Sequence, residues 1–193
     1  NGGSDPGLTS GVVTIFSTVY AFAALKSDGS VKAWGHSRYG GSDPGLTSGV
    51  VTIFSTARAF AALKSDGSVK AWGNSDNGGS DPGLTSGVVT IFSTDYAFAA
   101  LKSDGSVKAW GDSDNGGKDP GLTSDVVTIF STYQAFAALK TDGSVIAWGN
   151  LFYGGSDPGL TSGVVMVFST SQAFAALKSD GSVKAWGNSD YGG

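Results

Sequence analysis

The chain contains no cysteine and no glutamate, and only one histidine and one methionine occur among its 193 residues. The absence of cysteine excludes disulfides, thiolate nucleophiles and cysteine metal sites. A single histidine, His36, excludes a multi-histidine metal site and argues against a Ser–His–Asp triad. Because the straight-chain helix formers are scarce or missing, a helical protein is not expected.

Charge is scarce as well. Charged residues make up 15% of the chain, against about 25% in ordinary soluble domains. The formal net charge of −4 provides no basic surface for a phosphate backbone, so nucleic acid is not an expected partner. No apolar run approaches the roughly 20 residues of a membrane-spanning helix, and no signal segment is recognisable, so no membrane contact is expected. The compartment stays open, with a secreted or cell-surface location slightly favoured.

One unit is repeated five times. It contains SDPGLTSGVVTIFST, two variable residues, AFAALKSDGSVKAWG, a variable block of four and a final GG. The tryptophan of the unit recurs every 38 residues, at Trp34, Trp72, Trp110, Trp148 and Trp186. The units span residues 4–41, 42–79, 80–117, 118–155 and 156–193, and we expect them to form a single domain, residues 1–193.

Each unit is predicted to form three strands. In the first copy these are residues 12–17, 21–26 and 31–34, all rich in β-branched, aromatic or alanine residues. The Asp28-Gly29 pair between the second and third strands is a strong hairpin signal. In the connection that follows, residues 35–49, we expect a turn at Pro44-Gly45, with or without a short outer strand.

A two-residue turn at Asp28-Gly29 would set the register of this hairpin. Phe22 would then lie opposite Gly35, and Trp34 opposite Ala23, so that the two aromatic side chains occupy opposite faces. A sheet that is apolar on both faces must be packed between two other sheets.

The first and last units are as apolar as the middle three, although the end repeats of an open stack normally carry polar outer faces. A ring in which the last unit contacts the first removes this difficulty. The sequence therefore predicts an all-β fold, a five-bladed β-propeller with one 38-residue unit per blade.

The stretch AFAALKSDGSVKAWGNSDYGG, residues 173–193 in the last copy, resembles the repeat of the regulator of chromosome condensation family. The likeness covers about half of each unit. It implies a β-propeller, although that family usually has seven longer blades. The family's nucleotide-exchange and chromatin-binding activities are not carried over, because no copy has an inserted wedge and the chain is acidic.

Two stretches vary between copies: the pair at residues 19–20 and the block of four at residues 36–39, with their counterparts. The hairpin brings both to the same end of the sheet, away from Asp28-Gly29. This variable rim is a candidate binding face for a protein or a glycan, or its variation is drift on exposed loops. The candidate ligand-binding residues are Tyr20, Arg38, Tyr39, Arg58, Tyr96, Tyr133, Phe152, Tyr153 and Tyr191.

A lysine beside the hairpin tip recurs in every copy. Ring closure would arrange these lysines in a circle that could bind an anion, although lysines at strand ends more often keep sheet edges soluble. The five lysines are Lys26, Lys64, Lys102, Lys140 and Lys178.

Other motifs favour local structure over chemistry. Residues 112–116 superficially resemble a calcium loop, but Gly116 occupies a ligand position and no glutamate closes the site, so a turn is expected and no metal site. The Asp-Pro-Gly segments are predicted turns. Asp125 replaces a glycine of the other copies at a position where positive φ is suspected.

The interpretation we draw is a non-enzymatic propeller that serves as a binding or structural module, without cofactor and monomeric. A multivalent lectin that uses the variable rim is the alternative, and so is an engineered or recently duplicated propeller without a selected ligand. An enzyme is disfavoured, because no nucleophile, base and orienting group occur at a supported spacing. The remaining differences between copies look scattered, as drift would be: Lys118, Asp125, Thr141, Ile146, Met166 and Val167.

Overall fold

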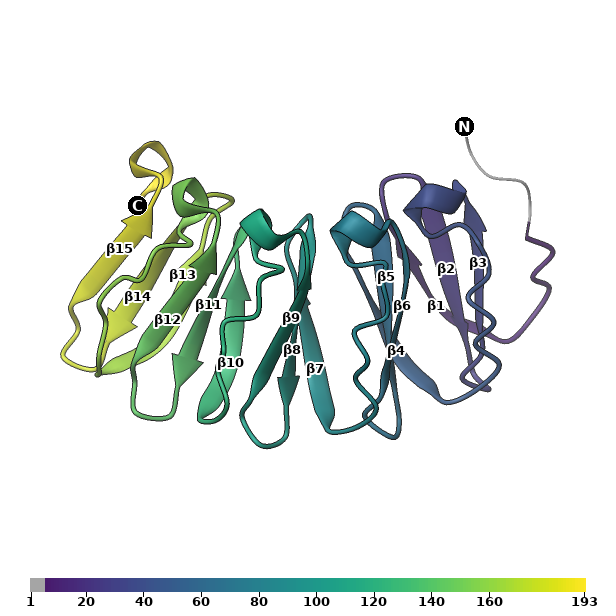
Figure 1. Cartoon of the computed structure of the whole chain (residues 1–193), viewed down its shortest axis with the longest axis horizontal. Helices are drawn as coiled ribbons and strands as arrows, with labels where there is room; N and C mark the ends of the chain where they lie inside the picture. The colour runs from purple at the N-terminus through teal and green to yellow at the C-terminus, as the bar shows by residue number, and fades with distance from the viewer. Residues whose placement is uncertain (1–5) are drawn as a thin grey trace. The chain divides into compact units, whose positions relative to one another are not determined.

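The computed structural model describes residues 6–193, and this part of the chain forms strands and short 3-10 turns without an α-helix (Figure 1). Each repeat supplies one antiparallel sheet of three strands, here called blades 1 to 5, with the order β1-β2-β3, β4-β5-β6, β7-β8-β9, β10-β11-β12 and β13-β14-β15. The predicted three strands per unit are therefore confirmed. None of the helical turns described for these residues has the length or apolar character to cross a membrane.

The strand bounds repeat with the sequence. The first strands are β1 (Val12–Ser17), β4 (Val50–Ser55), β7 (Val88–Ser93), β10 (Val126–Ser131) and β13 (Val164–Ser169). The middle strands are β2 (Ala21–Lys26), β5 (Ala59–Lys64), β8 (Ala97–Lys102), β11 (Ala135–Lys140) and β14 (Ala173–Lys178). The third strands are β3 (Val31–Gly35), β6 (Val69–Gly73), β9 (Val107–Gly111), β12 (Val145–Gly149) and β15 (Val183–Gly187).

A single 3-10 turn follows the third strand of every blade. It is formed by the variable block of four residues, a feature that the sequence pattern did not predict. These turns are η1 (Ser37–Tyr39), η2 (Ser75–Asn77), η3 (Ser113–Asn115), η4 (Leu151–Tyr153) and η5 (Ser189–Tyr191).

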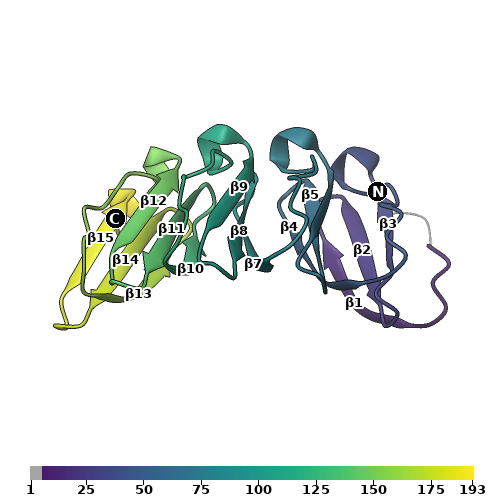
Figure 2. The same ribbon diagram turned by 60° about the horizontal axis from the view of Figure 1, so that its bottom comes forward.

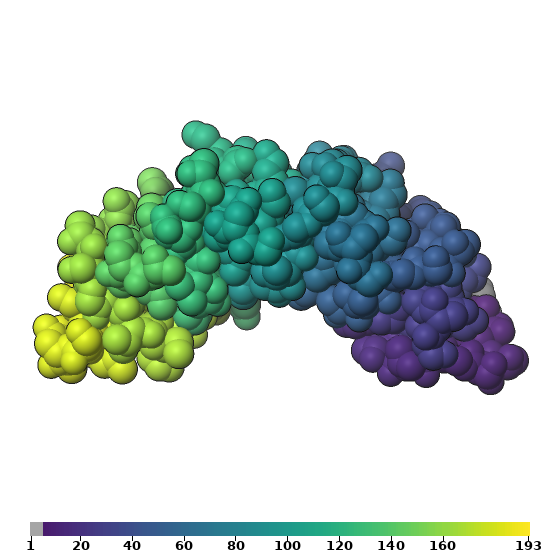
Figure 3. All heavy atoms as spheres, turned by 90° about the horizontal axis from the view of Figure 1, so that it is seen from below, coloured from purple at the N-terminus to yellow at the C-terminus, as the bar shows by residue number. Residues whose placement is uncertain are grey.

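The chain divides into two compact units, the first ending at Ile91 and the second spanning Phe92–Gly193. The first holds blades 1 and 2, and the second holds blades 4 and 5 and most of blade 3. Figure 2 shows the three strands of blades 4 and 5 side by side within the second unit. In the space-filling view, the atoms of neighbouring blades within each unit pack without a gap (Figure 3).

The predicted hairpin register is wrong by one residue. Phe22 pairs with Trp34, Ala23 with Ala33 and Leu25 with Val31. The cause is the loop, which has three residues instead of two: the Lys26 N–H donates to the Ser30 carbonyl over 2.9 Å, and Gly29 takes φ +76°. A type I turn followed by a glycine of positive φ has this geometry.

Each hairpin tip is closed by its aspartate. The Asp28 carboxylate accepts hydrogen bonds from the Ser30 N–H over 2.9 Å and from the Ser30 hydroxyl over 2.6 Å. These two bonds, and then the nearby Lys26 ammonium, hold the pKa of Asp28 below its ordinary value of 3.8. The same tip geometry and the same direction of pKa shift occur at Asp66, Asp104, Asp142 and Asp180.

These tips predict acid sensitivity. Because the folded pKa is lower than the unfolded one, the contribution to stability is complete above the unfolded pKa and is lost as the pH falls through the folded pKa. The urea midpoint should therefore be constant near neutral pH and fall below about pH 4. Replacing the five tip serines with alanine should make this fall shallower; an unchanged slope would contradict the assignment.

The corrected register gives each blade two different faces. Phe22 and Trp34 share one face with Ile15 and stack with their ring centroids 5.4 Å apart; we call this surface and its counterparts the aromatic face. The opposite surface, the alanine face, carries small and aliphatic side chains. In blade 1 it consists of Phe16, Ala21, Ala23, Leu25, Val31 and Ala33. Both faces are thus apolar, as predicted, although the aromatics do not lie on opposite sides.

Neighbouring blades pack an aromatic face against an alanine face. In the first unit, Ile53, Phe60 and Trp72 of blade 2 form one buried cluster with the alanine face of blade 1. The Trp72 indole N–H also donates to the Gly40 carbonyl of blade 1 over 3.0 Å. The second unit repeats this junction between blades 3 and 4 and between blades 4 and 5.

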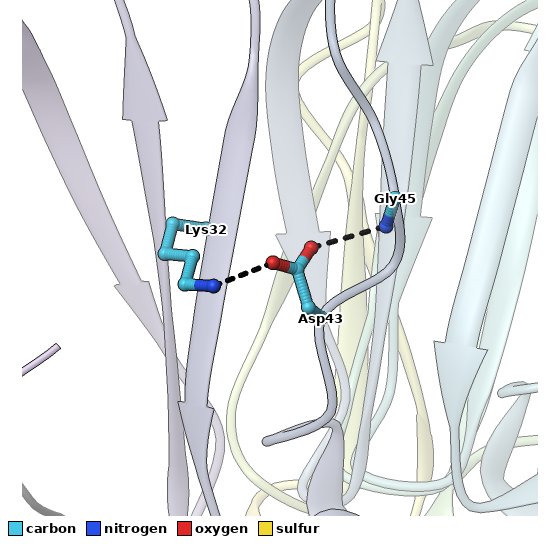
Figure 4. Close-up of polar contacts among 3 residues, drawn as sticks. All are labelled: Lys32, Asp43 and Gly45. Atoms are coloured by element: carbon cyan, nitrogen blue, oxygen red, sulfur yellow. Dashed lines mark hydrogen bonds and ion pairs between the residues drawn. The ribbon is translucent and has the colours of Figure 1, made fainter.

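The loop that connects one blade to the next runs beside the third strand of the preceding blade. The Val31 N–H donates to the Leu46 carbonyl over 2.9 Å, and the Asp43 carboxylate accepts from Lys32 over 2.7 Å and from the Gly45 N–H over 3.1 Å (Figure 4). Residues 36–49 contain no strand, and residues 43–47 contain neither a backbone turn nor a bend, so the turn predicted at Pro44-Gly45 is not formed by the backbone; the Asp43 side chain holds the Gly45 N–H instead. The corresponding turn of the first copy begins at Asp5, which lies outside the described residues.

Asp125 occupies a backbone conformation that favours glycine. Its φ is +69°, and the glycines at the equivalent positions have φ between +78° and +80°. Asp125→Gly should therefore raise the free energy of unfolding by about 0.5 to 1 kcal/mol, measured by urea denaturation. Ser124→Ala is the control, since its hydroxyl donates to the Asp125 carboxylate over 2.5 Å. A loss of stability in Asp125→Gly would show that this hydrogen bond outweighs the backbone strain.

Candidate functional site

The two variable stretches lie side by side in every blade, as the sequence predicted. In blade 1 the His36 N–H donates to the Tyr20 carbonyl over 2.9 Å, and the other four blades have the same bond at the same positions. A hydrogen bond between the two segments fixes their spacing while leaving their side chains free to differ. The variable rim is therefore a structural feature of each blade.

Part of this variation has a structural explanation. The first residue of each block caps the 3-10 turn: the His36 ring nitrogen accepts from the Arg38 N–H over 3.2 Å, and the Asn74 side chain accepts from the Asp76 N–H over 2.9 Å. Asparagine, aspartate and histidine are side chains that can accept such a bond. This position thus varies only among acceptors, which accounts for the lone histidine.

In the first unit, three rim side chains gather around Tyr39. The Tyr20 and His36 rings contact it edge-on, at centroid distances of 4.8 and 5.0 Å, and the Arg58 guanidinium of blade 2 lies 5.5 Å from its centroid. Tyr39 itself is half-buried against the junction of blades 1 and 2. Tyr20, Tyr39 and Arg58 therefore form one cluster, and Arg38 lies exposed beside it.

In the second unit the predicted residues divide into two kinds. Tyr133, Phe152 and Tyr191 are exposed, whereas Tyr96 and Tyr153 are half-buried. Tyr153 packs against the junction of blades 4 and 5, as Tyr39 does in the first unit. The tyrosine that ends the block in these two copies thus helps to join blades.

A pocket of about 600 Å³ opens where blade 4 presents its variable block to blade 3. Leu151 and Phe152 form an apolar wall, with 68% and 78% of their surfaces exposed. The pocket is also lined by Trp148, Asn150, Ser113, Asp114, Lys118, Asp119 and Pro120. Of the candidate ligand-binding residues, Phe152 lines this pocket.

The charges in this pocket are only partly neutralised. Asp119 is paired with Lys108 over 2.8 Å. Within residues 6–193, no ion pair is found for Lys118 or Asp114. An ammonium and a carboxylate therefore remain available beside the exposed ring of Phe152.

Three of the pocket residues are unique to the fourth copy. Lys118 replaces a serine, and Leu151-Phe152 replaces the Ser-Asp of copies two, three and five. The sequence made Lys118 look like scattered drift, because it lies 33 positions before Leu151. The structure brings all three into one pocket, so this part of the interpretation is corrected.

The five tip lysines have local partners. The Lys102 ammonium lies 3.8 Å from the Asp104 carboxylate, and the lysine at each tip helps to lower the pKa of the neighbouring tip aspartate. Lys26 and Lys178 have the same place at the ends of β2 and β14. Their arrangement in a common anion-binding circle stays a prediction.

The described residues contain no metal-binding cluster. No group of three or more histidine, cysteine or acidic side chains is positioned to hold a metal ion in the part of the chain from residue 6 onward. Asp112 is the cap of η3, accepting from the N–H groups of Asp114 and Asn115. The turn predicted for residues 112–116 is confirmed.

Comparison with solved structures shows the fold. The chain resembles the ectodomain of the receptor kinase CR4 from Physcomitrella patens (TM-score 0.62, 15% identity, 91% of this chain and 51% of that one). It also resembles Prp20p from Saccharomyces cerevisiae (0.60, 19%, 90% and 56%) and human WBSCR16 (0.58, 18%, 91% and 61%).

The chain spans 51% to 61% of the length of these three structures. No family model matches its sequence, and no curated protein matches it. Another solved structure with this likeness, at a TM-score of 0.59, is that of yeast RCC1 (Prp20) bound to Kap60. The predicted fold class is therefore confirmed: the five repeats are blades of an all-β propeller fold, similar to that of yeast RCC1 (Prp20).

Proposed function

We propose that residues 1–193 act as one non-enzymatic β-propeller domain that binds a protein partner through the variable rim, with the pocket at Leu151 and Phe152 as the main contact. The observation that carries this proposal is the convergence of three copy-specific residues, Lys118, Leu151 and Phe152, on one pocket. Exposed aromatic side chains next to polar groups are typical of the centres of protein interfaces.

The neighbours in structure support a protein partner in general. Prp20p was studied for its binding to Gsp1p and histones, and the yeast RCC1 structure contains Kap60. These partners belong to those proteins. A protein partner is supported in this chain by the variable rim. There the residues that differ between copies are carried on short turns by a rigid blade scaffold.

Reverting the pocket to the repeat consensus is the direct test. Leu151→Ser with Phe152→Asp restores the pair found in three other copies, so the turn should fold unchanged. Partners captured by the wild-type chain, identified by mass spectrometry and then purified, should bind this variant at least tenfold more weakly in calorimetry. Tyr191→Asn, the residue of copies two and three, is the matched control at another blade.

Equal binding by the reverted variant and the wild type would contradict the proposal. That result would favour a duplicated or engineered propeller without a selected ligand, for which the rim is only variable loop.

A second candidate, a multivalent lectin, is favoured by the chemistry of the same pocket. An aromatic ring beside Asp114 and the Asn150 amide offers stacking and hydrogen bonds to sugar hydroxyls. A glycan array tests it: specific binding that is lost in Phe152→Ala supports a lectin, and an empty array with folded protein rejects it.

A further inference from the structure

Two matching grooves lie side by side in the first unit, one in blade 1 and one in blade 2. Their volumes are about 540 and 550 Å³. Each residue that lines the groove of blade 2 lies 38 positions after one that lines the groove of blade 1, and Leu46 lines both. All of these residues belong to the first unit. The two grooves are therefore adjacent copies of one surface feature.

Among the described residues, four charged side chains line the groove of blade 1, and three of them have close partners. The Lys32 ammonium lies 2.7 Å from the Asp43 carboxylate (Figure 4). The Asp28 carboxylate accepts two hydrogen bonds from Ser30, over 2.9 and 2.6 Å. Lys26 lowers the pKa of Asp28 less than these two bonds do, and within residues 6–193 no carboxylate lies at ion-pair distance from its ammonium. The Lys26 ammonium is therefore the charge that this groove offers to a ligand.

The lysine of each groove is held in place along its stem. Lys26 and Lys64 are half-buried, and an added Cβ at Gly11 or Gly49 would lie 3.3 Å from the Cε atom of Lys26 or Lys64, respectively. The Gly11 carbonyl is itself fixed by the Ser27 N–H over 2.8 Å. A lysine whose stem is packed loses less rotamer freedom on binding than a fully exposed one. Each ammonium is therefore presented at a defined place.

The groove is kept in every copy, in contrast to the variable rim. The positions of Lys26, Asp28 and Thr47 carry the same residue in all five copies, and the position of Lys32 differs only in copy four, where it is Ile146. Thr47 is exposed, as most rim residues are, so burial does not explain its constancy. Exposed loop positions vary when nothing constrains them. A constant exposed surface beside a variable one indicates that the groove has a role of its own.

The lining of the groove favours a peptide with isolated acidic side chains. Leu46 and Val31 offer apolar contacts beside the Lys26 ammonium, and an acidic residue among apolar ones carries both kinds of group. A densely charged polyanion, such as a sulfated glycan, would be repelled by the Asp28 and Asp43 carboxylates of the same groove. Charge complementarity therefore extends to one carboxylate per groove.

We propose that the grooves of blades 1 and 2 bind one extended peptide, which places one acidic side chain on Lys26 and another on Lys64. Packed sheets lie about 10 Å apart, and an extended or polyproline chain advances about 3.1 to 3.4 Å per residue. The two acidic residues should therefore be three or four positions apart. Two weak sites joined by one ligand gain affinity through effective concentration. The site is independent of the pocket at Phe152, which lies in the second unit.

Fluorescence anisotropy of the whole chain with labelled peptides tests this proposal. The probes are blocked at both ends, contain leucine and serine, and carry either one glutamate or two glutamates that are two to six positions apart. Peptides with a spacing of three or four should bind at least about tenfold more tightly than the peptide with one glutamate. Equal affinity at every spacing, or for one glutamate and two, would overturn the proposal.

Single substitutions locate the site. Lys64→Gln should bind the two kinds of peptide equally, whereas Lys64→Arg should keep the difference because the charge is retained. Lys70→Ile introduces the residue of copy four and should weaken binding about two- to fivefold, because the Asp81 carboxylate, now 2.8 Å from Lys70, loses its cation. Lys118→Ser, the same loss of charge at the pocket of Phe152, is the control and should bind as the wild type does. Unchanged affinity in Lys64→Gln, or tighter binding of heparin than of the peptides, would overturn the proposal.

Discussion

Phe136→Ala is expected to lower the free energy of unfolding by about 3 to 5 kcal/mol. Phe136 is fully buried in the aromatic face of blade 4, and its ring lies 5.2 Å from that of Trp148. Opposite it are Ala97, Ala99 and the other small residues of blade 3, which cannot extend to fill the space. The substitution therefore leaves a cavity at a junction between two rigid sheets, where relaxation is small.

The matched control is Phe22→Ala, the same change at the same position of blade 1. Phe22 is partly exposed and packs mainly on Trp34, so its truncation leaves no comparable enclosed cavity. We expect a loss of about 1 kcal/mol or less in dilute solution, from urea denaturation followed by tryptophan fluorescence.

Much of the blade could be predicted from the sequence because its signals are local and are repeated five times. The strands at residues 12–17 and 21–26 have the predicted bounds, and the rim follows from their antiparallel pairing. The register could not be predicted from Asp28-Gly29 alone. A two-residue and a three-residue loop both suit that pair, and the choice depends on the Ser30 bonds to Asp28.

The candidate site could be predicted only in outline. Variation between copies identified the rim and Phe152, but it could not show that Tyr39 and Tyr153 partly serve the junctions between blades. Lys118 was missed because it lies 33 positions before Leu151 in the sequence. Spatial convergence of copy-specific residues is visible only once the blades are packed.

Gly116→Ala is expected to cost about 3 kcal/mol or more of unfolding free energy, for two reasons that add. The residue has φ +102°, which side chains other than hydrogen rarely adopt. An added Cβ would also lie 2.7 and 2.8 Å from two ring carbons of Phe136. Neither the Gly116 backbone nor the Phe136 ring can move apart easily to relieve this contact. The Gly116 carbonyl accepts the Trp148 indole N–H over 3.0 Å, and the Phe136 ring is fully buried.

Gly121→Ala separates the two causes. Gly121 has φ +71°, and an added Cβ would meet nothing within 4 Å, so this variant should cost only the backbone strain, about 1 to 2 kcal/mol. The remainder of the Gly116→Ala loss is then the collision with Phe136. The double variant Gly116→Ala with Phe136→Ala should lose less than the sum of the single losses, because removing the ring makes room for the methyl group. Strictly additive losses would show that the loss comes from backbone strain and not from a collision of the added methyl group with Phe136.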